Sequence, residues 1–203
     1  MSIRNLSKMF RPQSIAVIGG TDRPKSVGSA LMTNLLRGGF AGPILPVNRN
    51  ATAVHGIMAY KDVAGLPITP DLAVIATPPD THADYCIRAL EAGAHVVCEK
   101  PFVSSVKEAD RVIEAAARAG RQVALNHEFR EMPIYRALRD AAAPSDVVFA
   151  QVWQLMDLPP WAEPGWRGQM LQRTLYEAGV HLVDFLMALF GEKPRSVSAT
   201  PST

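Results

Sequence analysis

The fold is decided by residues 14–36. They contain the β-branched run Ser14-Ile-Ala-Val-Ile18, the turn Gly19-Gly-Thr-Asp-Arg-Pro-Lys-Ser-Val-Gly28, and a helical stretch from Val27 to Leu36. Strand, glycine-rich turn and helix in this order are typical of the first unit of a nucleotide-binding sheet. Glycines let backbone N–H groups approach a pyrophosphate, and the start of the next helix carries partial positive charge. The spacing is not GxGxxG, so a turn that only joins strand to helix remains the alternative.

Short apolar runs and longer helical stretches continue to alternate as far as residue 143. We expect strands at 44–47, 72–76, 95–98 and 122–125, and helices at 81–92, 105–119 and 132–142. Residues 50–66 are ambiguous, with a short strand expected near 57–60. Pro46 lies inside the second strand, which predicts an edge position or a kink. The alternation predicts a Rossmann-like, doubly wound parallel α/β sheet over residues 1–143.

The pattern changes after Pro144-Ser145. We expect a long strand at 147–156, a helix at 169–190 that ends before Gly191, and a last strand at 195–199. Residues 144–203 are too few to bury a sheet alone, so they predict a short, incomplete α+β unit for substrate binding or oligomerisation. This unit packs on the first domain, pairs with another chain, or begins a longer structure. Unprotected strand edges and apolar surface at 147–166 favour a homo-oligomer.

Composition argues for a small-molecule partner. The 203 residues are 48% hydrophobic and 20% charged, with a net charge of +2, too small to predict binding to nucleic acid or a membrane surface. No apolar run approaches the roughly 20 residues that cross a bilayer, and no signal peptide is expected. Cys86 and Cys98 show no CxxC spacing, which fits a cytoplasmic location. No histidine has metal-ligand spacing, so no metal is predicted.

The second strand ends in Val47-Asn48-Arg49. In an NAD site this position usually carries an acidic residue that binds the ribose hydroxyls, and here there is none. Arg49 suits a phosphate on the ribose instead, through charge-assisted hydrogen bonds. NADP and coenzyme A both carry such a phosphate. A solvated surface arginine is the equally weighted alternative.

The first third of the chain resembles one known family. The likeness covers residues 6–79 and is carried by Phe10–Asp22, Val27-Gly28 and Pro46–Asn48, which resemble the CoA-binding Rossmann domain of NDP-forming acyl-CoA synthetases and succinyl-CoA ligase. This resemblance implies CoA as an alternative ligand. It also implies an alternative function, a CoA-binding module without dehydrogenase activity.

Residues 71–200 resemble a second family. Ala76-Thr-Pro-Pro-Asp-Thr-His82 and the segment Ala89–Pro101, which ends in Glu99-Lys-Pro101, are similar to the Gfo/Idh/MocA family of glucose-fructose oxidoreductase and inositol dehydrogenase. Asn126, Phe129-Arg130, Pro133 and Gly179–Asp184 continue the likeness. The family implies NAD(P)-dependent oxidation of a secondary alcohol in a sugar-like or polyol substrate. A third interpretation is a non-catalytic remnant that forms oligomers.

The second resemblance also implies roles for individual residues. Lys100 lies beside the nicotinamide ribose and polarises the substrate oxygen, and its peptide bond to Pro101 is cis. His181 is the acid or base, and Glu177, where many members have aspartate, orients it from one helical turn away. His82 lies near the cofactor and could cap its helix. A surface charge for Lys100 and a packing role for His181 are the alternatives. The predicted cofactor-binding residues are Gly19, Gly20, Thr21, Gly28, Asn48, Arg49, Ala76, Thr77, Pro78, His82, Glu99, Lys100 and Asn126.

Overall fold

The computed structural model describes residues 6–142, 147–153, 175–198 and 200. The chain divides into two compact units, Met1–Asn126 and His127–Thr203. The domain boundary predicted near residue 143 lies at 143–146, outside the described residues. Within the described ranges, no helix is both long enough and apolar enough to cross a membrane.

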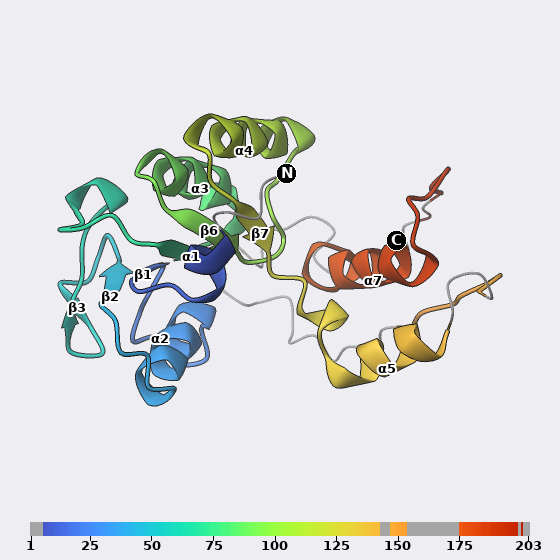
Figure 1. Cartoon of the computed structure of the whole chain (residues 1–203), viewed down its shortest axis with the longest axis horizontal. Helices are drawn as coiled ribbons and strands as arrows, with labels where there is room; N and C mark the ends of the chain where they lie inside the picture. The colour runs from blue at the N-terminus through green and yellow to red at the C-terminus, as the bar shows by residue number, and fades with distance from the viewer. Residues whose placement is uncertain (1–5, 143–146, 154–174, 199, 201–203) are drawn as a thin grey trace. The chain divides into compact units, whose positions relative to one another are not determined.

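The first unit is built on a five-stranded parallel sheet with the strand order β2-β1-β5-β6-β7 (Figure 1). Its strands are β1 (Ile15–Ile18), β2 (Ile44–Val47), β5 (Leu72–Ile75), β6 (His95–Cys98) and β7 (Val123–Leu125). Its helices are α1 (Leu6–Phe10), α2 (Val27–Arg37), α3 (His82–Glu91) and α4 (Val106–Ala119). The predicted Rossmann-like α/β fold is therefore confirmed, although α1 was not expected.

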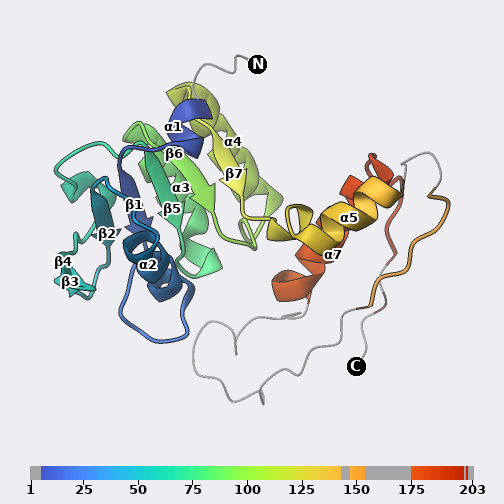
Figure 2. The same cartoon turned by 60° about the horizontal axis from the view of Figure 1, so that its bottom comes forward.

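Helices cover both faces of this sheet, as a doubly wound fold requires (Figures 1 and 2). Ala16 and Ile18 of β1 belong to one buried cluster, together with apolar residues of α3 and α4. Ile15 and Val17 belong to the other cluster, which includes Met32 of α2. Alternate residues of a strand point to opposite faces, so a strand that is apolar throughout serves two cores.

Strand β2 lies at one edge of the sheet, as Pro46 predicted. Proline has no N–H to donate, but its carbonyl oxygen still accepts a hydrogen bond of 2.9 Å from the N–H of Tyr60. The ambiguous residues 50–66 form a hairpin of β3 (Ala53–Val54) and β4 (Ile57–Met58), followed by the 3-10 helix η2 (Val63–Gly65).

The described secondary-structure elements of the second unit are all helical. They are the 3-10 helix η4 (Glu128–Arg130), α5 (Pro133–Ala141), a π-helical turn η6 (Leu175–Gly179) and α7 (Val180–Phe190). The strands expected at 147–156 and 195–199 are wrong for their described parts, 147–153 and 195–198. A strand needs a neighbour for its backbone hydrogen bonds, and the described residues supply none for these segments. Phe149 and Trp153 are exposed, and the homo-oligomer stays a prediction.

His95, at the start of β6, is expected to make the stability of the fold depend on pH. Its ring is fully buried, and Nδ1 accepts a hydrogen bond of 3.1 Å from the N–H of Gln122. Burial lowers the pKa of His95, and the positive charge of Arg121 lowers it further. The native ring therefore stays neutral at a pH at which the unfolded chain already binds a proton. We expect the free energy of unfolding to fall as the pH drops below about 6.5, by at most about 1.4 kcal/mol per pH unit from this residue.

Urea unfolding at pH 7.5 and pH 5.5 measures this contribution. His95→Asn is a control because its side chain accepts the same kind of hydrogen bond but takes up no proton. The stability of this variant should change less between the two pH values than that of the natural sequence. Equal changes in the two proteins would exclude His95 as the source.

Candidate nucleotide-binding site

The glycine turn packs β1, β5 and α2 closely together. Gly19 has a φ of +94°, and a Cβ added to it would lie 2.7 Å from the carbonyl oxygen of Ala76. A Cβ added to Gly28 would overlap the carbonyl oxygen of Gly19. Both positions therefore require glycine, and α2 begins directly against the turn. This tight packing of helix against strand is the role that a later glycine has in dinucleotide-binding turns.

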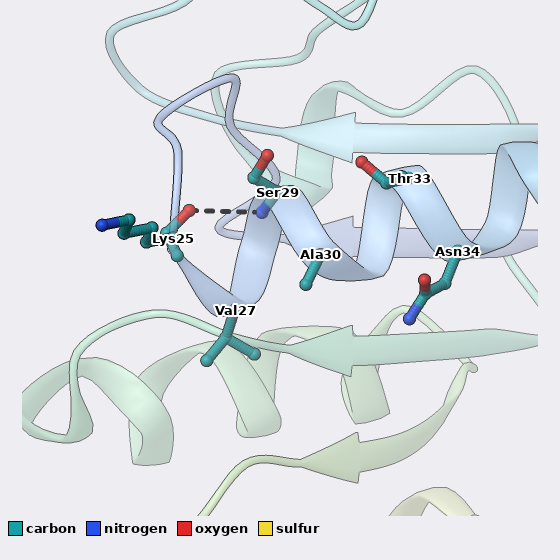
Figure 3. Close-up of a pocket in the computed structure, with 7 residues that line it drawn as sticks. Lys25, Val27, Ser29, Ala30, Thr33 and Asn34 are labelled. Carbon is teal, nitrogen blue, oxygen red and sulfur yellow. Dashed lines mark hydrogen bonds between the residues drawn. The ribbon is translucent and has the colours of Figure 1, made fainter.

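The start of α2 presents backbone N–H groups. Ser26 is the N-cap and its hydroxyl accepts a hydrogen bond of 3.3 Å from the N–H of Ser29 (Figure 3). The first N–H groups of an α-helix have no partner inside the helix, which leaves those of Val27 and Gly28 available to an anion. Because the turn and the helix start are arranged in this way, these residues fit the pyrophosphate of a nucleotide.

A cavity of about 530 Å³ follows α2 from its cap to its second half (Figure 3). Its lining is Lys25, Ser26, Val27, Ser29, Ala30, Thr33 and Asn34. Lys25 adds a positive charge beside the helix start, and it has a φ of +59°. The cavity therefore combines a cation, hydroxyl groups and short apolar side chains. None of these lining residues was predicted as a site residue, although their neighbour Gly28 was.

Two polar residues at the end of β2 were predicted to bind the cofactor. The side-chain amide of Asn48 donates a hydrogen bond of 2.8 Å to the carbonyl oxygen of Gly20, and its oxygen accepts from the N–H groups of Asn50 and Ala51. Asn48 thus fixes the glycine turn to the strand. Arg49 is exposed beside it.

The hairpin β3–β4 is attached to the same turn through residues that the sequence reasoning missed. Asp22 Oδ1 accepts a hydrogen bond of 2.7 Å from the N–H of His55, at the tip of the hairpin. The His55 ring nitrogen Nε2 lies 3.5 Å from the hydroxyl of Ser29. A titratable ring and a carboxylate therefore border the glycine turn. The only signal in the sequence was His55-Gly56, a pair suited to a tight turn.

His82 joins the segments that follow β5 and β6. Its ring is buried, with 1% of the residue exposed. Nε2 lies 2.7 Å from the carbonyl oxygen of Thr77, and Nδ1 lies 2.9 Å and 3.0 Å from those of Pro101 and Phe102. The side chain therefore does not cap α3, whose N-cap residue is Thr81.

Other predicted residues gather at the carboxyl ends of neighbouring strands. Glu99 and the half-buried Lys100 follow β6, and the peptide bond to Pro101 is cis, as the resemblance implied. Asn126 follows β7 and donates a hydrogen bond of 2.7 Å to a carboxylate oxygen of Glu99. The carboxyl ends of parallel strands lie along one edge of the sheet, and doubly wound sheets bind ligands there. This edge carries Glu99, Lys100 and Asn126, together with Ala76–Pro78 and the glycine turn.

In the second unit, His181 lies in a cluster of aromatic and charged side chains. It is buried and stacks on Phe129, with a distance of 4.4 Å between the ring centroids. Its Nε2 is 3.8 Å from a carboxylate oxygen of Glu128, a residue that the sequence reasoning missed. Arg130 donates two hydrogen bonds, of 2.6 Å and 2.7 Å, to Asp184, and these raise the pKa of Arg130. Residues of η4 and α7 are thus held together around the imidazole.

Glu177 is half-buried and lies in the π-helical turn before α7. The role predicted for it assumed α-helical spacing, in which residues four apart share a face. A π-helical turn closes its hydrogen bonds over five residues, so that geometry does not extend across 175–179. π-helical turns are frequent at functional sites, which draws attention to this end of α7.

Comparison with known proteins agrees with this geometry. Residues 39–127 match a family described as an oxidoreductase family with an NAD-binding Rossmann fold. The matched segment is less than half of the chain, and over it the chain is similar to the Gfo/Idh/MocA family. The chain is 27% identical over 179 residues to a 1,5-anhydro-D-fructose reductase of Ensifer adhaerens, a match that covers 85% of this chain and 51% of the reductase. An oxidoreductase domain protein from Kribbella flavida is 26% identical, with a TM-score of 0.64 over 87% of this chain and 53% of that protein.

The likeness to CoA-dependent enzymes is also confirmed. A trans-feruloyl-CoA synthase from an unknown prokaryotic organism is 40% identical over 77 residues, which are 38% of this chain and 11% of the synthase. This chain is thus similar to two classes of protein, oxidoreductases and a CoA-dependent synthase. It spans about half of the length of the reductase and a smaller part of the synthase.

Proposed function

We propose that this chain binds NAD(P) and takes part in the oxidation or reduction of a secondary alcohol in a sugar-like or polyol substrate. The observation that carries the proposal is the shared edge of the sheet. The glycine turn with the start of α2 and the segment Glu99-Lys-Pro101 both lie at the carboxyl ends of parallel strands. When bound, NAD(P) supplies the hydride acceptor or donor.

The proposed roles of the chain's residues follow from their chemistry and from the family likeness. The turn Gly19–Gly28 and the first N–H groups of α2 hold the pyrophosphate. Lys100 stabilises negative charge on the substrate oxygen, as a cation near a developing alkoxide does. His181 exchanges the hydroxyl proton, as histidine side chains do in general acid–base catalysis.

CoA binding without dehydrogenase activity is the second candidate. It is favoured by the strong local likeness to the feruloyl-CoA synthase and by Arg49, an exposed arginine that directly follows Asn48 at the end of β2. CoA and NADP both carry a phosphate on the adenosine ribose, which an arginine binds by charge-assisted hydrogen bonds. The two candidates therefore share a pyrophosphate site and differ in their need for Lys100.

Thermal unfolding with NADH, NADPH and CoA, each added separately, discriminates between the candidates. A ligand at 100 times its dissociation constant stabilises the folded chain by about 2.7 kcal/mol, and NADH or NADPH should do so. Arg49→Gln should weaken NADPH binding about 10- to 100-fold and leave NADH binding unchanged, because a lost hydrogen bond to a charged group costs about 1.5 to 3 kcal/mol.

Stabilisation by CoA alone would replace the oxidoreductase proposal with the CoA-binding one. The matched control for Arg49→Gln is Arg37→Gln. Arg37 is also an exposed arginine, but it lies at the carboxyl end of α2, away from the glycine turn. Equal losses of NADPH affinity in both variants would show a general effect of charge rather than a phosphate contact.

A further inference from the structure

The ring of His82 is surrounded by hydrogen-bond acceptors on both sides. Nε2 faces the carbonyl oxygen of Thr77, and Nδ1 faces those of Pro101 and Phe102, all at 2.7 to 3.0 Å. A carbonyl oxygen accepts hydrogen bonds and cannot donate them. Each ring nitrogen must therefore carry a hydrogen for these contacts to be attractive.

A neutral imidazole has one N–H, and its other nitrogen is an acceptor. In this site such a ring would direct a lone pair at a carbonyl oxygen within 3.0 Å, in a place closed to water. A buried polar atom that lacks its partner is costly, whereas a charged donor makes a stronger hydrogen bond than a neutral one. The geometry favours the doubly protonated ring.

His82 joins the two segments that resemble the Gfo/Idh/MocA family, Ala76–His82 and Glu99–Pro101. Thr77 lies directly after β5, and Pro101 and Phe102 directly follow Lys100 after β6. On the other side of Lys100, the carboxylate of Glu99 is held by Asn126. Hydrogen bonds therefore hold both chain neighbours of Lys100, one through its side chain and one through its carbonyl group.

We propose that His82 is a positioning residue for Lys100, and that it acts by donating hydrogen bonds from both ring nitrogens to the backbone after β5 and β6. This inference rests on the proposed oxidoreductase function. The His82 ring holds the carbonyl groups of Pro101 and Phe102, and it thereby fixes the position of the backbone that carries the Lys100 side chain. A displacement of about 1 Å in a reacting group can lower a rate about a hundredfold.

The first test is made on the natural chain without any ligand. Nitrogen-15 NMR of the chain labelled at histidine should show both ring nitrogens of His82 protonated at pH 7.5, and His82→Gln identifies the signals by their loss. A ring with one unprotonated nitrogen at that pH would overturn the proposal. This measurement is independent of activity, so it gives its answer even where the proposed function fails.

The second test is kinetic and uses His82→Gln, whose amide can donate to one side of the site but not to both. With NADPH and 1,5-anhydro-D-fructose, or NAD with myo-inositol, kcat should fall about a hundredfold while the dissociation constant of the dinucleotide changes less than threefold. An unchanged kcat in the folded variant would overturn the positioning role. Absence of dinucleotide binding and turnover in the natural chain would instead remove the proposed function.

His95→Asn is the matched control. His95 is as buried as His82, but it lies at the amino end of β6, whereas Lys100 follows the carboxyl end of this strand. This variant should lose stability and keep its kcat. If both variants lost kcat in proportion to their lost stability, His82 would have a structural role only, and the proposal would be wrong. A crystal structure of His82→Gln should show residues 100–102 displaced from the segment after β5.

Discussion

Lys100→Met is expected to lower kcat by about 10² to 10³ and to leave dinucleotide affinity within about tenfold, a change of at most about 1.4 kcal/mol. Methionine keeps the length and most of the apolar contacts of lysine but removes its charge. Loss of one group that stabilises developing negative charge costs about 10² to 10³ in kcat. Steady-state kinetics with sugars and polyols, and fluorescence titration with NADPH, measure the two effects separately.

Lys107→Met is the control for that experiment, because Lys107 is an exposed lysine in the first turn of α4. It should change neither kcat nor affinity. Turnover by Lys100→Met at more than a tenth of the natural rate would show that the lysine does not stabilise the reacting oxygen. A parallel loss of affinity and kcat would show that Lys100 binds the cofactor only.

The sheet was predictable because buried parallel strands have a simple signature. Ile15–Ile18 and Leu72–Ala76 are apolar at successive positions, so they indicate strands that are covered on both faces. In the structure, each of these strands contributes residues to both hydrophobic clusters. The edge position of β2 followed from Pro46 alone. The hairpin at 53–58 has strands of two residues, which is too short for any periodic pattern. The expected strand at 147–156 had the right residues, but pairing depends on a neighbouring strand and not on composition.

The site was predictable where its residues lie directly after strands. Lys100 and Asn126 follow β6 and β7, and the ends of parallel strands meet at one edge. Contacts between distant segments leave no such signal. The hydrogen bond between His55 and Asp22 joins positions 33 residues apart, and Glu128 approaches His181 from another element. Neither pair has a spacing that a single sequence reveals. The exact partners of His82 were hidden for the same reason.

Gly28→Ala is expected to destabilise the first unit by about 3 kcal/mol, the upper part of the usual range for overpacking. The added methyl group would overlap the carbonyl oxygen of Gly19, which is backbone and cannot rotate away. The carbonyl is itself fixed, because the N–H of Gly20 in the same peptide group donates a 3.2 Å hydrogen bond to the carbonyl oxygen of Val17. Relief therefore requires α2 to move away from the turn, and that movement separates the helix start from the pyrophosphate site. Dinucleotide affinity should fall along with stability.

Gly65→Ala provides the contrast, since a Cβ on Gly65 would meet no described atom within 4 Å. Alanine there should change the free energy of unfolding by less than about 1 kcal/mol, because it only restricts the unfolded chain. Urea unfolding of both variants measures the difference. If Gly28→Ala were as stable as Gly65→Ala, the close packing of α2 on the turn would not be maintained in solution. The turn would then lack the rigid geometry on which nucleotide binding depends, because a mobile loop must lose conformational entropy before it can hold a pyrophosphate.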